Sequence, residues 1–140
     1  MKIAQVSPLY EAVPPKLYGG TERVVSYLTD ALVDLGHDVT LFASGDSVTK
    51  AKLEAAWPRA LRLDDTIRDP IAPHVAMVET VARRAREFDL IHLHCDHIAY
   101  PLMSRINVPV VSTLHGRLDM AELVPIYQHY PNIPLVSISN

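Results

Sequence analysis

The strongest constraint on the fold is the alternation of short apolar runs with segments of helical period. The runs at 3–7, 38–43, 89–94, 109–114 and 135–139 are apolar or β-branched over most of their length, and more polar segments separate them. Strands that are apolar on both sides are typical of a parallel sheet covered by helices on both faces. The sequence therefore predicts a doubly wound α/β domain with three layers, α/β/α.

The segments between these runs predict helices. We expect the first helix to have Thr21 as its N-cap and to stop at Gly36, with an apolar stripe made of Val24, Leu28, Leu32 and Leu35. Later segments predict a helix from Pro73 to Glu87, a short helix over 96–104 and a helical turn within 119–130. Residues 48–70 are ambiguous, and a short helix at 50–56 followed by a strand at 60–63 is the expectation.

Composition narrows the class of protein. A chain of 140 residues suits one domain, and its net charge of −3, from 13 basic and 16 acidic residues, argues against a nucleic-acid-binding protein. The single cysteine, Cys95, rules out an intramolecular disulfide, and no apolar run approaches the roughly 20 residues of a membrane span. These features predict a soluble cytoplasmic protein and leave peripheral contact with a membrane open.

A glycine pair lies between the first strand and the first helix. Ligands of open parallel sheets bind beyond the carboxyl ends of the strands, and a helix N-terminus offers free N–H groups to an anion. Gly19 and Gly20 could let a phosphate approach the backbone, but they equally suit a turn that needs positive φ. The segment matches neither the dinucleotide glycine motif nor the P-loop motif, which argues against NAD and ATP sites.

Histidines follow two of the predicted strands. His92 and His94 are two residues apart on one strand and therefore point to the same side, and Asp96 and His97 come directly after them. Neighbouring residues at a strand end rarely converge on one ion, so we expect no metal site. We expect His92 to pack against the sheet, and His94, Asp96 and His97 to line a cleft.

His115 directly follows the predicted strand at 109–114 and should reach the same edge of the sheet. Gly116 then allows the chain to turn away. A histidine in this place can donate to an anion or a sugar hydroxyl, or transfer a proton. A purely structural hydrogen bond is the alternative.

Taken in order, these segments resemble family 4 glycosyltransferases, enzymes of the GT-B fold in which two Rossmann-like domains face each other across a cleft. The resemblance covers nearly the whole chain and is carried by Gly19–Arg23, Leu35–Ala43, Phe88–His94, Thr113–Gly116 and Ser137–Ser139. It implies that residues 1–140 are the N-terminal, acceptor-side Rossmann-like domain, one half of a GT-B architecture. The C-terminal donor-binding domain would then be missing, and the chain alone is expected to be inactive.

The resemblance also implies roles for individual residues. The donor diphosphate would be contacted by Gly19, Gly20 and Thr21, the reaction centre by His115, and the acceptor by Asp96, His97 and His94. Members of the family usually transfer the sugar with retention of configuration and usually need no metal. The implied partners are therefore a nucleotide sugar and an unknown acceptor, with no cofactor.

Two other kinds of function stay open at this point. One is a nucleotide-sugar epimerase or a phosphorylase of the same fold, and the other is a non-catalytic domain that binds a sugar or nucleotide. A phospho-receiver domain is disfavoured because Ser7 and Pro8 stand where its acidic cluster would follow the first strand.

Overall fold

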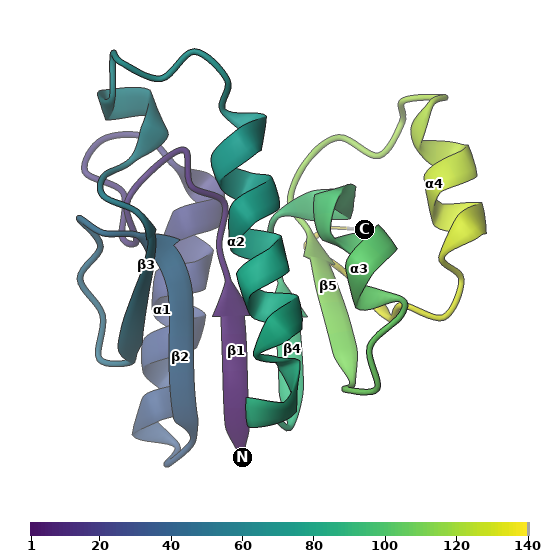
Figure 1. Cartoon of the computed structure of the whole chain (residues 1–140), viewed down its shortest axis with the longest axis horizontal. Coiled ribbons are helices and arrows are strands. Elements are labelled where there is room, and N and C mark those ends of the chain that lie inside the picture. Colours follow the sequence, from purple (N-terminus) through teal and green to yellow (C-terminus); the bar gives the residue numbers. More distant parts are fainter. Residues whose placement is uncertain (140) are drawn as a thin grey trace.

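A six-stranded parallel sheet forms the middle layer of the computed structural model, which describes residues 1–139 (Figure 1). The strands are β1 (Lys2–Val6), β2 (Asp38–Ser44), β3 (Lys52–Trp57), β4 (Leu90–Leu93), β5 (Val110–Leu114) and β6 (Leu135–Ser137). The helices are α1 (Gly20–Asp34), α2 (Ile71–Arg83), α3 (Tyr100–Met103) and α4 (Leu123–His129), with 3₁₀ turns η1 (Leu61–Leu63), η2 (Ala85–Glu87) and η3 (Asp96–Ala99). Helix α1 lies behind the sheet in Figure 1, whereas α2 and α3 lie in front of it.

The strand order is β3-β2-β1-β4-β5-β6, and this order creates a topological switch point between β1 and β4. The chain moves outward from β1 through β2 to β3, returns to the other side of β1, and moves outward again through β4, β5 and β6. Crevices outside the carboxyl ends of the strands at such a point are the usual ligand sites of doubly wound sheets. The structure confirms the predicted Rossmann-like, three-layer α/β/α fold and a strand at each of the five apolar runs.

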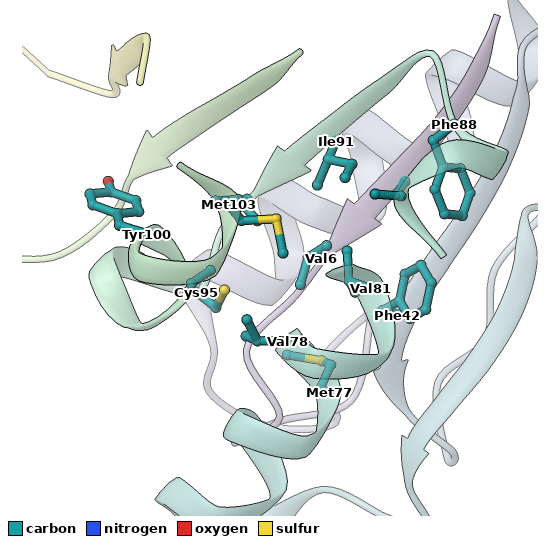
Figure 2. Packing of buried hydrophobic residues seen from close by; sticks show 14 of the residues in the cluster. Val6, Phe42, Met77, Val78, Val81, Phe88, Ile91, Cys95, Tyr100 and Met103 are labelled. Atoms are coloured by element: carbon teal, nitrogen blue, oxygen red, sulfur yellow. The ribbon is translucent and has the colours of Figure 1, made fainter. Parts of the chain in front are cut away.

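The larger hydrophobic core lies between the sheet and the layer formed by α2 and α3 (Figure 2). Val6 and Ile91 from the sheet pack with Met77 and Val81 from α2 in this cluster, and each of these side chains is buried. Phe42 and Phe88 meet edge to face, with ring centroids 6.0 Å apart. A smaller cluster on the other face comprises Val13, Val25, Leu41 and Ala43.

The predicted apolar stripe of α1 is only partly buried, because Leu28 and Leu32 are half-buried and the other two residues are exposed. Val24 and Leu35 are 41% and 75% exposed, and the buried positions are Glu22, Val25, Ser26 and Thr29. The helix docks through Val25, which packs with Val13, Leu41 and Ala43, and the polar residues Glu22, Ser26 and Thr29 are buried on the same face. Docking geometry, rather than the strongest apolar periodicity, decides which face is covered.

The predicted start of α1 is wrong by two residues, whereas its predicted stop is confirmed. Gly19 is the N-cap, so Thr21 lies inside the first turn. Gly36 has φ +87°, its N–H donates to the carbonyl of Val33, and the N–H of His37 donates to the carbonyl of Leu32. This is a Schellman motif, which favours glycine because of the left-handed backbone.

Residues 48–70 also differ from the expectation. The segment predicted as a short helix forms strand β3, and Leu61–Leu63 form a 3₁₀ turn instead of a strand. Lys52 to Ala55 pair with Thr40 to Ala43 of β2 in parallel register. Side chains with good helix propensity are held in a strand because β2 offers an unpaired row of backbone donors and acceptors.

The predicted helix from Pro73 to Glu87 is α2 followed by η2. The short helix expected over 96–104 is η3 followed by α3, and the turn expected within 119–130 is α4. Within residues 1–139, no helix has both the length and the apolar character needed to cross a lipid bilayer.

Candidate functional site

A pocket of about 770 Å³ lies at the carboxyl edge of the sheet, where the switch point between β1 and β4 opens. Four segments form most of it: the loop after β1, the start of α1, the η3 turn after β4, and the residues that follow β5. Every residue predicted to bind donor or acceptor, or to act at the reaction centre, lines this one pocket: Gly19, Gly20, Thr21, His94, Asp96, His97 and His115.

The loop after β1 is fixed by contacts with segments far away in the sequence. The N–H of Leu61 donates to the carbonyl of Leu9 at 2.9 Å, and the N–H of Leu9 donates to Nε2 of His74 at 2.9 Å. His74 Nδ1 lies 2.7 Å from the carbonyl oxygen of Pro70, to which it therefore donates. Burial lowers the pKa of His74, which keeps the ring neutral in this bridging role.

Gly19 and Gly20 differ sharply in their surroundings. A Cβ on Gly19 would lie 2.8 Å from Cβ of Pro15 and 2.9 Å from Oε2 of Glu22, so only glycine fits there. A Cβ on Gly20 would meet nothing within 4 Å. Gly19 has φ 169°, which is extended backbone, and Gly20 is the first residue of α1, so the alternative of a left-handed turn is wrong for both. The space beside Gly20 is open to a ligand in the pocket.

Two buried glutamates lie beneath the glycine loop, and sequence reasoning gave neither of them a role in the site. Arg62 Nη1 donates to Oε1 of Glu11 at 2.6 Å, and the Glu11 side chain is almost fully buried. Glu22 is 5% exposed and lines the pocket, and its pKa is raised by burial and by the charge of Glu11. Glu22 follows Gly19 by three residues, which is the capping-box spacing, and the prediction of Thr21 as the N-cap hid this signal.

A continuous row of polar side chains crosses β1, β4 and β5 on the face that carries α1. Gln5 Oε1 lies 2.8 Å from Nε2 of His94, and Nδ1 of His94 lies 2.9 Å from Nε2 of His115. On the other side, Gln5 Nε2 lies 3.4 Å from Nδ1 of His92, whose Nε2 lies 2.7 Å from Oγ1 of Thr113. Parallel register places Gln5 directly beside His92.

The three histidines of this row are held in the neutral form. Burial, with a smaller contribution from the neighbouring imidazoles, lowers the pKa of His92 to about 4 and that of His94 to about 2. Burial also lowers the pKa of His115, although the Asp96 carboxylate opposes this effect. As expected, His92 packs against the sheet. His94 is less free than expected, because it is 1% exposed and both of its ring nitrogens are hydrogen-bonded.

Asp96 and His97 lie at the start of η3 and keep exposed surface in the pocket. Asp96 has φ 53°, the one left-handed non-glycine residue in the described part of the chain. Such backbone is uncommon for a residue with a side chain and often accompanies a functional site. Partial burial raises the pKa of the Asp96 carboxyl group, and the nearby imidazoles of His97 and His115 oppose this rise.

Cys95 and the surrounding histidines provide neither a reactive thiol nor a metal centre within residues 1–139. Cys95 is buried and burial raises the pKa of its thiol to about 12, which makes it a poor nucleophile. Within residues 1–139, no group of three or more histidine, cysteine, aspartate or glutamate side chains is arranged to hold a metal ion. The histidine nitrogens bond to one another and to Gln5 and Thr113 instead.

Fold and pocket together define a Rossmann-like α/β domain with a polar ligand site at its topological switch point. The family model described as Glycosyltransferase Family 4 matches residues 18–137. The chain therefore belongs to glycosyltransferase family 4. A comparison with curated protein sequences found no match.

Two solved structures share the fold. AviGT4, a glycosyltransferase involved in avilamycin A biosynthesis, is 23% identical with a TM-score of 0.52, and the match covers 96% of this chain and 41% of AviGT4. The C-terminal domain of the coenzyme A biosynthesis bifunctional protein CoaBC is 11% identical with a TM-score of 0.58, and the match covers 97% of this chain and 76% of that domain. This chain thus spans less than half the length of AviGT4.

Proposed function

We propose that this domain forms the acceptor side of a glycosyltransferase that takes a sugar from a nucleotide-sugar donor and transfers it with retention. The observation that carries the proposal is the pocket at the switch point, where an open glycine at a helix N-terminus, Gly20, faces the same space as His115 and Asp96. Membership of glycosyltransferase family 4 supports the reaction class.

In this proposal the donor diphosphate lies against the N-terminus of α1. The N–H groups of Gly19, Gly20 and Thr21 belong to the unpaired first turn of the helix, where the helix dipole favours negative charge. The open space beside Gly20 lets a phosphate oxygen approach the backbone. The leaving diphosphate is stabilised there as its charge develops.

The acceptor is proposed to lie against Asp96 and His97, with His115 beside the transferred sugar. Asp96 and His97 offer a carboxylate and an imidazole with exposed surface at the pocket, as hydroxyl recognition requires. His94 was predicted to contact the acceptor as well. Its two hydrogen bonds favour an indirect contribution through His115.

A second domain is proposed to complete the site. Catalysis requires that donor and acceptor are held together, and most of the donor nucleotide would be bound by a domain outside this chain. The length of AviGT4, of which the match covers 41%, supports this arrangement. We propose that the complete protein works in the cytoplasm without a metal or other cofactor, and that the 140-residue chain alone is inactive.

The test is a screen of the complete gene product for release of UDP, GDP or ADP from a panel of nucleotide sugars, with and without candidate acceptors and with a chelator as a parallel condition. We expect turnover of one donor that the chelator does not reduce. Free isomerised sugar would indicate an epimerase, dependence on inorganic phosphate a phosphorylase, and binding without turnover a sensory domain. Each of these three outcomes would overturn the proposal.

Two variants and a control test whether this pocket is the active site. Gly20→Ala places a methyl group where the diphosphate is proposed to approach, so we expect the donor KM to rise about 10-fold or more. His115→Ala should lower kcat by about 10²-fold, as for removal of a residue at the reaction centre. His129→Ala is the matched control, because His129 is an exposed histidine of α4 outside this pocket. Equal activity of all three variants would exclude this pocket as the site.

A further inference from the structure

With the Gln5 amide oriented as in the structure, its oxygen toward His94 and its nitrogen toward His92, the row of side chains from Thr113 to His115 has one consistent assignment of protons. The Gln5 amide oxygen accepts only, so Nε2 of His94 carries the proton of that 2.8 Å hydrogen bond. A neutral His94 then has a lone pair on Nδ1, which accepts from Nε2–H of His115 at 2.9 Å. His115 is thereby placed in its Nε2–H form, with the lone pair on Nδ1.

The other half of the row agrees with this assignment. The Gln5 amide nitrogen donates to Nδ1 of His92, so the proton of neutral His92 lies on Nε2 and is donated to Oγ1 of Thr113. Gln5 is fully buried between the two rings, and a single amide therefore orients both of them. Reversal of the amide would reverse every proton of the row and leave His115 as Nδ1–H, so the Nε2–H form follows from the amide orientation in the structure.

The lone pair on His115 Nδ1 is the end of the row that a ligand can reach. Nδ1 makes no hydrogen bond within residues 1–139, and His115 lines the pocket. A lone pair accepts from a hydroxyl group and repels the oxygen of a phosphate or carboxylate. An imidazole fixed as Nε2–H thus discriminates between these two chemical classes at the reaction centre.

We infer that Gln5 and His94 are positioning residues that fix His115 in its Nε2–H tautomer, so that Nδ1 accepts a hydrogen bond from a hydroxyl group of the sugar or the acceptor and does not donate to the diphosphate. This inference rests on the proposed transferase function. It assigns roles to Gln5 and His94 that neither the fold nor the family membership assigns. Neither residue touches the substrate; both act through His115.

The test compares two replacements of Gln5. Gln5→Met keeps the approximate size and removes the acceptor for His94, so His115 loses its fixed tautomer. Gln5→Glu keeps an acceptor oxygen against His94 in either protonation state and should preserve the tautomer. Nitrogen-15 NMR of the histidine rings in the 140-residue chain reads the tautomer directly, and circular dichroism of the same samples reports whether each variant is folded.

We expect the Nε2–H form of His115 in the wild type and in Gln5→Glu, and a mixture of tautomers in Gln5→Met. In the complete gene product, Gln5→Met should lower kcat about 10-fold with little change in donor KM. Gln5→Glu should keep most of the wild-type kcat. An Nδ1–H form of His115 in the wild type, or a tautomer that both variants leave unchanged, would overturn the inference. A wild-type protein that turns over no nucleotide sugar would sink the proposed function instead, and the NMR result would still decide the tautomer.

Discussion

Alanine at Gly19 and alanine at Gly20 should have opposite effects on stability, although the two glycines are adjacent. A Cβ on Gly19 would lie 2.8 Å from the rigid ring of Pro15 and 3.2 Å from Cγ of Glu11, both closer than normal contact. Relief requires movement of the loop or of the buried carboxylates, which as overpacking costs about 2 kcal/mol. A Cβ on Gly20 is unopposed in the first turn of α1, where alanine stabilises a helix by up to about 1 kcal/mol.

Urea unfolding measures this difference, with the fluorescence of Trp57 and circular dichroism as two independent probes. For an m-value of about 2 kcal/mol/M, Gly19→Ala should lower the midpoint by about 1 M, whereas Gly20→Ala should leave it unchanged or raise it. The m-values should agree, because both proteins expose the same surface on unfolding. Equal destabilisation by the two replacements would refute the steric argument. So would a Gly19→Ala protein as stable as the wild type.

Three further changes test other parts of the structure. Tyr100→Phe removes the 2.9 Å hydrogen bond to the fully buried Oγ of Ser112 and should lower the free energy of urea unfolding by about 1–2 kcal/mol. Adding Ser112→Ala should recover most of this loss of stability, and additive losses from the two replacements would argue against the bond. Acid should destabilise the fold, because the pKa values of His92 and His94 are lowered to about 4 and about 2. The unfolded state binds these protons below about pH 6.5, so the free energy of unfolding should be constant above that pH and then fall by up to about 1.4 kcal/mol per pH unit for each histidine. A series of urea unfolding curves from pH 8 to pH 4 measures this pH dependence. A free energy of unfolding that does not change with pH would contradict the neutral state of the two histidines. Gly36→Ala forces a side chain into φ +87° and should lower the free energy of unfolding by about 1 kcal/mol, measured by calorimetry.

Much of the site could be predicted from the sequence, because the carboxyl ends of parallel strands meet at one edge of the sheet and the polar motifs directly follow predicted strands. Once the apolar runs predict parallel strands, residues that directly follow a strand must gather at one edge, and His94, Asp96 and His115 do line one pocket. The residues that were missed come from elsewhere. Arg62 reaches the pocket from the η1 turn, inside the segment whose structure was misjudged, and Gln5 lies within β1, where an isolated polar residue carries no local signal.

The misjudged elements share a physical cause. The segment at 50–56 has helix-forming side chains, yet it forms β3 because β2 lies beside it with free backbone groups. The apolar stripe of α1 is partly solvent-exposed because the helix docks through Val25 over Leu41 and Ala43. In both cases a partner that is distant in sequence overrides a local preference worth at most about 1 kcal/mol per residue.

The sequence by itself determined the strand runs, the glycine stop of α1 and the edge of the sheet at which chemistry-bearing residues gather, because these depend on period and backbone preference over a few neighbouring residues. Only the tertiary structure decided which face of α1 is buried, where β3 pairs, and how the histidines share their protons. The hydrogen bond between Gln5 and His94 joins residues 89 positions apart, so the protonation of His115 follows from strand register that no local pattern encodes.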